Sequence, residues 1–89
     1  MADFTIKDYI YSRHKKGDHD VLYVLSDVDE ATSDEIYAGY VNDTAGWIVV
    51  RYTKSAGITN VRYCIGDSDY STNWNNRAGL SYDYYYNWF

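Results

Sequence analysis

The chain has 89 residues, of which 13 are acidic and 8 are basic, so its formal net charge at pH 7 is −5. This length predicts a single β domain over residues 1–89. The acidic balance argues against nucleic-acid binding, because neutralising phosphates requires a basic face. No run of residues approaches membrane-spanning length, and the first residues lack the basic start and long apolar core of a signal peptide. We therefore expect a soluble product without membrane insertion.

The sequence offers little for metals, cofactors or catalysis. A single cysteine, Cys64, excludes an internal disulfide, and no Cys/His cluster has zinc-site spacing. His14 and His19 flank a glycine-containing turn without a third imidazole or thiolate, and the acidic segments at 27–30 and 67–69 lack the full ligand set of a calcium loop. No histidine lies near Cys64 in sequence to activate it as a nucleophile. We expect no cofactor, no metal and no enzymatic activity.

Aromatic residues are abundant, with 12 Tyr and 3 Trp, and the chain contains no Pro. Aromatic side chains favour strands, and Tyr and Trp also favour surfaces that bind partners. The alternative is that a small β core recruits aromatics to fill its volume. A domain of this size buries only about 60% of its unfolded surface, so a neighbouring subunit would be the most economical reinforcement.

The N-terminal part predicts a hairpin. Residues 4–13 alternate imperfectly between apolar and polar side chains, which indicates a strand with one wet face. Residues 14–20 form a polar turn, and residues 21–25 are a second, fully apolar strand. Residues 26–34 are acidic and nearly devoid of packing residues, so we expect a connecting loop with at most one helical turn.

The central hairpin is predicted over residues 35–53. Two runs of β-branched and aromatic residues flank the turn 42–46, in which Gly46 is the expected site of positive φ. Residues 47–50 are apolar on both faces of the second strand. Such a strand lies between two layers of its own chain or is covered by another chain, and the sequence leaves both open.

The C-terminal part begins with a strand at 59–65, which completes a meander. Residues 66–77 are dense in Gly, Asp, Ser and Asn and predict a long loop with at most a short helical turn at 72–76. Residues 80–89 alternate aromatic and polar side chains, and we expect them to pair as a strand with their own sheet or a neighbour's, since exposing apolar area costs about 25 cal/mol per Å². Their candidate partner-contact residues are Tyr82, Tyr84, Tyr85, Tyr86, Trp88 and Phe89.

Together these elements predict an all-β fold. It would be a small antiparallel sandwich or meander of about six strands, with one long Asn/Asp-rich loop that carries a short helical turn. Two interpretations of that loop stay open. Aromatic rings stack on sugars while amides bind hydroxyls, which predicts a carbohydrate contact. We favour the alternative, a structured corner in which Trp74 fills the core and Arg77 ties carbonyls or a carboxylate together. The candidates are Asp69, Tyr70, Trp74, Asn75, Asn76 and Arg77.

Two motifs carry a family resemblance. Tyr-x-Gly-x-Val-x5-Trp ends at Trp47, and the more specific Gly-x-x-x-Tyr-x3-Trp-Asn-Asn-Arg-x3-Ser/Thr-Tyr runs from Gly66 to Tyr82. Over residues 36–82 the chain resembles small uncharacterised virion-associated β proteins encoded in the structural gene modules of tailed bacteriophages.

The resemblance implies a non-catalytic structural protein of a virion, synthesised in the host cytoplasm. It would be a head decoration, neck, tail or fibre component that assembles as a homo-oligomer or with other virion proteins. One alternative is a carbohydrate-binding or host-recognition module with a glycan partner. The other is a self-assembling extracellular filament subunit.

Overall fold

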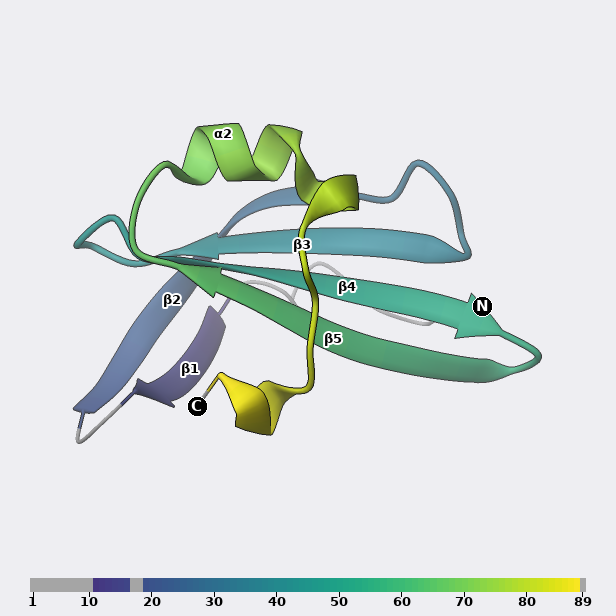
Figure 1. The fold of residues 1–89 in the computed structure, drawn as a ribbon, viewed down its shortest axis with the longest axis horizontal. Helices are drawn as coiled ribbons and strands as arrows, with labels where there is room; N and C mark the ends of the chain where they lie inside the picture. The colour runs from purple at the N-terminus through teal and green to yellow at the C-terminus, as the bar shows by residue number, and fades with distance from the viewer. Residues whose placement is uncertain (1–10, 17–18, 89) are drawn as a thin grey trace.

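The structure, a computed structural model, describes the backbone of residues 11–16 and 19–88 and the side chains of residues 23–88. The described residues form one antiparallel sheet with strand order β1-β2-β3-β4-β5 (Figure 1). The strands are β1 (Tyr11–Lys16), β2 (His19–Asp29), β3 (Glu35–Val41), β4 (Trp47–Ser55) and β5 (Ile58–Gly66). The predicted antiparallel, mostly β fold is confirmed, whereas six strands and a sandwich are not.

The predicted central hairpin is formed by β3 and β4, which pair from Glu35↔Thr53 to Val41↔Trp47. In its turn, the Asn42 Oδ1 atom accepts the backbone N–H groups of Thr44, at 2.9 Å, and Gly46, at 2.8 Å. The residue with positive φ is Ala45, at 71°, so the expectation for Gly46 was wrong. Gly46 has a different role, because a Cβ atom there would lie 2.6 Å from the Asn42 side chain that closes the turn.

The apolar centre of β4 lies between two clusters of its own chain. Ile48 and Val49 point to opposite faces, and both are fully buried. The first cluster comprises Tyr23, Ala38, Tyr40, Ile48 and Val50, and the second comprises Tyr37, Trp47, Val49 and Cys64. The sequence left open whether another chain covers this strand, and the structure shows that a single chain buries both of its faces.

The second cluster is covered by the segment that follows β5. This segment contains the helix α2 (Tyr70–Asn75) and the 3-10 turns η1 (Arg77–Gly79) and η2 (Tyr85–Asn87). Figure 1 shows α2 lying over the sheet and the chain then crossing β4 and β5 toward its C-terminus. Its side chains that pack against the cluster are Tyr70, Trp74, Leu80, Tyr82 and Trp88.

The loop predicted over residues 26–34 was wrong for residues 26–29, which belong to β2, and residues 30–34 form the connection to β3. The strand β2 continues to Asp29, with a register shift between Leu25 and Asp27 where it pairs with β3. Acidic residues are tolerated in this strand because the carboxylates of Asp27 and Asp29 accept hydrogen bonds from Tyr70 and Arg77. Those partners are 43 and 48 residues away in sequence, so the local pattern could not reveal them.

The predicted C-terminal strand was also wrong. Asp83 makes a single antiparallel bridge with Tyr63 of β5, with N···O distances of 2.8 and 2.9 Å, and the chain then turns into η2. Because the segment crosses the sheet instead of running along β5, it pairs at one position only. The Trp88 indole N–H also donates to the Tyr63 carbonyl oxygen, at 2.7 Å, so this aromatic tail is anchored within the chain.

The N-terminal hairpin has a narrower turn than predicted. His14–Lys16 lie within β1 and pair with His19–Val21 of β2, and the first part of the predicted strand, residues 4–10, lies outside the described residues. Among the described residues, no helix has the length and apolar character needed to cross a bilayer.

The turn between β4 and β5 offers a test of the backbone geometry. Ala56 and Gly57 have φ values of 52° and 80°, which identifies a type I′ turn that favours Asn-Gly. We expect Ala56→Asn to raise the free energy of unfolding by about 0.5–1 kcal/mol, since Asn tolerates positive φ better than Ala. Urea denaturation would measure this, with Ala31→Asn in the exposed β2–β3 connection as a control without such a gain. No change in Ala56→Asn would contradict the turn assignment.

Candidate functional site

Residues 69–77 fold into a corner that lies against β2 and β3. A Cβ atom at Gly39 would overlap the Tyr70 hydroxyl and lie 2.9 Å from the Trp74 ring. The missing side chain at Gly39 therefore lets α2 approach the sheet closely. On the neighbouring strand, the Trp47 indole N–H donates to the carbonyl oxygen of Ser68, at 2.6 Å, and holds the chain that leads into the helix.

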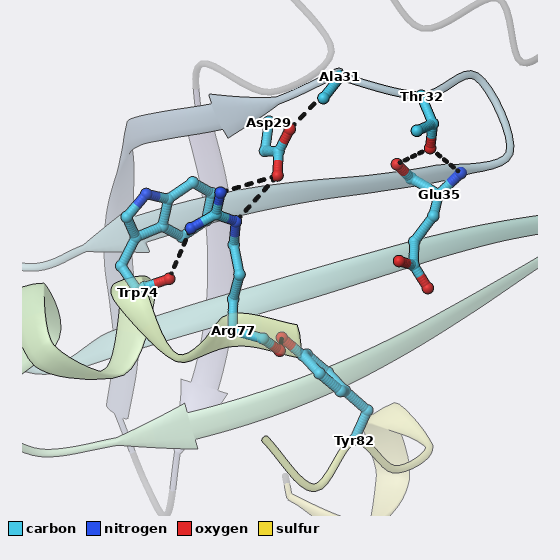
Figure 2. Close-up of polar contacts among 7 residues, drawn as sticks. All are labelled: Asp29, Ala31, Thr32, Glu35, Trp74, Arg77 and Tyr82. Carbon is cyan, nitrogen blue, oxygen red and sulfur yellow. Dashed lines mark hydrogen bonds and ion pairs between the residues drawn. The ribbon is translucent and has the colours of Figure 1, made fainter. Parts of the chain in front are cut away.

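Arg77 joins this corner to the sheet, as Figure 2 shows. Its Nε and Nη2 atoms lie 3.0 and 2.8 Å from the same oxygen, Oδ2 of Asp29. Its Nη1 atom donates to the carbonyl oxygen of Trp74, at 2.8 Å, and the guanidinium carbon lies 4.5 Å from the centre of a Trp74 ring. Arg77 thus ties the end of α2 to the end of β2 and occupies one face of the Trp74 side chain.

The Asp29 carboxylate is satisfied on both oxygens. Oδ1 accepts the backbone N–H of Ala31, at 3.0 Å, while Oδ2 accepts the guanidinium of Arg77. The hydrogen bond from Ala31, followed by the bond from Arg77, lowers the pKa of Asp29 below its usual value, against the smaller opposing effect of burial. Asp29 is therefore ionised beside the guanidinium of Arg77, which it binds.

Two tyrosine hydroxyls extend the network. The Tyr70 hydroxyl donates to Asp27, at 2.8 Å, and the Tyr82 hydroxyl donates to the Arg77 carbonyl oxygen, at 2.6 Å. Burial raises the pKa of both phenols, and for Tyr70 the bond to Asp27 adds to this effect. Both groups therefore stay protonated and serve as donors.

This arrangement is what the structured-corner interpretation requires of Trp74 and Arg77. Asp69 is the N-cap of α2, with a φ of 59°, and its carbonyl oxygen accepts the N–H of Asn73. Asn75 and Asn76 lie apart from the network and line an open depression of about 460 Å³, together with Ala78, Gly79 and Leu80. Sugar binding by these residues stays a prediction.

The predicted contact residues of the tail divide into two groups. Tyr82 and Trp88 are half-buried against the second cluster, and Phe89 lies outside the described residues. Tyr84, Tyr85 and Tyr86 are 46%, 37% and 72% exposed, and we refer to these three residues as the tyrosine surface. Aromatic rings that a folded chain leaves exposed together mark a candidate binding surface.

The tyrosine surface is held in place by polar residues. The Asp83 Oδ1 atom accepts the N–H of Tyr84, at 2.7 Å, and the side-chain amide of Asn87, at 2.9 Å. The hydrogen bonds from Asn87 and Tyr84, with a smaller effect of the nearby charge of Arg62, lower the pKa of Asp83. Sequence reasoning missed Asp83 and Arg62, although the Asp-x-x-x-Asn spacing was a usable signal for a local cap.

The rings of the tyrosine surface are themselves ordered by packing. The Tyr84 and Tyr86 rings are nearly parallel, with centres 5.3 Å apart and an angle of 9°. The guanidinium carbon of Arg62 lies 4.0 Å from the centre of the Tyr84 ring. Tyr85 packs edge-on against Tyr63, at 5.2 Å. Each of the three rings therefore has a contact within the chain that limits its freedom.

Potential metal ligands do not gather in the part of the chain whose side chains are described. No group of three or more His, Cys, Asp or Glu residues within it could hold an ion. His14 and His19 have side chains outside that part. Cys64 is buried, and burial raises the pKa of its thiol, which opposes formation of the reactive thiolate.

Comparisons with known proteins gave no match: neither a family model, nor a curated protein, nor a solved structure is similar to this chain. The resemblance to bacteriophage proteins therefore stays a prediction.

The close approach of α2 to the sheet can be tested at Gly39. We expect Gly39→Ala to lower the free energy of unfolding by about 1–3 kcal/mol, because the new methyl group displaces Tyr70 and Trp74. Urea denaturation would report stability, and tryptophan fluorescence would report the displaced ring. Gly79→Ala is the matched control, since a Cβ atom there meets nothing within 4 Å. Equal stability of the two variants would contradict the packing described.

The contribution of Asp29 should depend on pH. Because folding lowers the pKa of Asp29 from 3.8, its stabilising effect is present above that value and is lost as the pH falls through the folded-state pKa. We expect Asp29→Asn to cost about 1 kcal/mol at pH 7, and to cost less under strongly acidic conditions. Denaturation curves across the acidic range would measure this. Asp43→Asn, in the exposed β3–β4 turn, is the control, and an equal pH dependence of the two variants would refute the role of Asp29.

Proposed function

We propose that this chain is a structural component of a tailed bacteriophage particle and acts through contacts with other protein subunits. The observation that carries the proposal is the tyrosine surface, where the three consecutive residues Tyr84, Tyr85 and Tyr86 are exposed. The resemblance of residues 36–82 to virion-associated β proteins supports the same role. The particle would be its location, as a head decoration, neck, tail or fibre component.

The tyrosine surface suits protein contacts for energetic reasons. Tyrosine rings offer a large apolar area with a polar hydroxyl, and they are enriched where proteins bind one another. Here the rings are already ordered by Arg62, Asp83 and Tyr63, so binding would freeze little further side-chain motion. A pre-ordered surface loses less entropy on association.

The burial of the sheet within one chain is compatible with assembly from subunits that are already folded. Since one chain covers both faces of β4, a protomer can fold before it meets its partners. The folded protomers would then assemble through the tyrosine surface, either with copies of themselves as a homo-oligomer or with other virion proteins. Symmetric contacts repeated over many copies give a stable particle even where each contact is weak.

A carbohydrate-binding or host-recognition module is the second candidate. The observation that favours it is the depression of about 460 Å³ beside η1, where the exposed residues Asn75 and Asn76 lie next to Leu80. Amide groups bind sugar hydroxyls, and an apolar side chain such as Leu80 can contact the C–H groups of a sugar ring. Trp74 does not line this depression, and Arg77 already occupies one face of its ring.

The proposed location can be tested on phage particles. We expect this protein to co-purify with phage particles that have been banded on a density gradient. Its amount relative to the major capsid protein should be constant across independent preparations. Quantitative mass spectrometry would measure that ratio, with a host cytoplasmic protein of similar mass as the control for trapping. Recovery of the chain only in the soluble fraction of the lysate would overturn the proposal.

A further inference from the structure

We infer that Arg51 and Arg62 together bind a small dianionic oxyanion, such as a phosphate group, where the C-terminal segment crosses β4 and β5. The inference goes beyond the proposed function and does not depend on a role in the virion. Three features carry it: two arginines opposite one another in the sheet, guanidinium donors that the chain leaves unused, and aromatic rings that fix the guanidinium planes.

The two arginines are direct neighbours on one face of the sheet. Arg51 of β4 and Arg62 of β5 are paired in the strand register, which places their Cβ atoms about 5 Å apart. Like charges directly opposite one another destabilise a sheet. An anion bound between the two guanidinium groups would replace this repulsion with two attractions.

Arg51 is positioned by packing and not by hydrogen bonds. Its Nε atom is buried without a hydrogen-bond partner, and its guanidinium forms no ion pair with the described residues. Arg77 gives the contrast, because its Nε, Nη1 and Nη2 atoms all donate to oxygen atoms of the protein. Polar groups inside proteins are nearly always satisfied, so an arginine whose donors the chain does not use indicates a missing acceptor. An oxyanion held by the Nη atoms of Arg51 would be such an acceptor.

Arg62 commits one nitrogen within the described chain. Its Nη1 atom donates to the carbonyl oxygen of Val61, at 2.9 Å. No carboxylate oxygen of the described residues lies within 4.0 Å of this guanidinium. The positive charge of Arg62 contributes to the lowered pKa of Asp83, but less than the hydrogen bonds from Asn87 and Tyr84 do. The Nε and Nη2 groups of Arg62 therefore stay available for a ligand.

Two tyrosine rings fix the planes of these guanidinium groups. The guanidinium carbon of Arg51 lies 4.5 Å from the centre of the Tyr82 ring, and that of Arg62 lies 4.0 Å from the centre of the Tyr84 ring. Both rings belong to the segment that crosses the two strands (Figure 1). A ring covers the face of a guanidinium, whereas the N–H groups point outward in its plane. Stacking therefore orders the two cations and leaves their donors directed at a ligand.

The charge of the site defines the class of ligand. Two guanidinium groups balance a dianion, whereas a single carboxylate would balance only one of them. Inorganic phosphate and a phosphate monoester share this chemistry. The net charge of −5 opposes a long polyanion such as a nucleic acid. A ligand this small makes few contacts, and we expect a dissociation constant of about 1 mM.

A phosphate titration of the wild-type chain provides the test. We expect the Nε–H signals of Arg51 and Arg62 in proton–nitrogen correlation spectra to shift and to saturate as inorganic phosphate is added. Chloride at the same ionic strength is the control for screening and should leave these signals in place. Methyl phosphate is titrated in parallel, and tighter binding of this ester than of the free ion would assign the site to an organic phosphate. Shifts that do not saturate, or that chloride reproduces, would overturn the inference.

Substitutions locate the bound anion. Arg51→Gln and Arg62→Gln should each weaken phosphate binding about tenfold, because each removes charge-assisted hydrogen bonds. Lys54→Gln makes the same change of charge on the opposite face of β4 and should bind phosphate normally. Asp83→Asn keeps an oxygen that can accept the Tyr84 N–H and removes a negative charge beside Arg62, so it should strengthen binding about twofold.

The variants can also contradict the site. Wild-type affinity in both glutamine variants would place the anion elsewhere, and an equal loss in Lys54→Gln would show a general effect of charge. Weaker binding in Asp83→Asn would contradict a position beside Arg62. Circular dichroism checks that each variant folds, and the wild-type titration decides the matter if one of them does not.

Discussion

The bond between Arg77 and Asp29 fixes where the covering segment lies on the sheet. The sheet has a second apolar face around Val49, and the chain covers it with short helical turns that make few regular hydrogen bonds to the strands. Such a cover would slide on apolar contacts alone, because these are not directional. The two bonds from Arg77 to one carboxylate oxygen fix its position on β2. The pair is partly exposed, at 27% and 22%, so its role is to fix geometry more than to add stability.

An element of this fold could be predicted from the sequence where the contacts that stabilise it join residues close together in the chain. The central hairpin is visible in sequence because its turn residue, Asn42, bonds within four residues. The strand β2 is visible only to residue 25, because Asp27 and Asp29 look like loop residues until Tyr70 and Arg77 approach from the other end of the chain. The alternating aromatic tail predicted a strand because alternation alone does not say whether a segment runs along a sheet or across it.

The corner shows the same division. Its local half was predictable, since Arg77 bonds to the Trp74 carbonyl oxygen three residues away. Its other half was not, because no pattern links Arg77 to Asp29. Likewise, Tyr84 to Tyr86 were recognisable as candidate contact residues, but the residues that order them were not. Arg62 comes from β5 and reaches the rings only because Asp83 bridges to Tyr63.

Because the chain covers its own sheet, association with a partner would have to be driven by residues outside the core. The sequence allowed a neighbouring chain to cover the apolar central strand. Instead the central strand is buried within a single chain, and the exposed rings lie on the segment that forms the cover. Continuous contacts link the two regions, since Tyr82 bonds to Arg77 and the next residue, Asp83, bonds to β5 and caps Tyr84. The same covering segment that completes the core therefore also positions the surface available for binding.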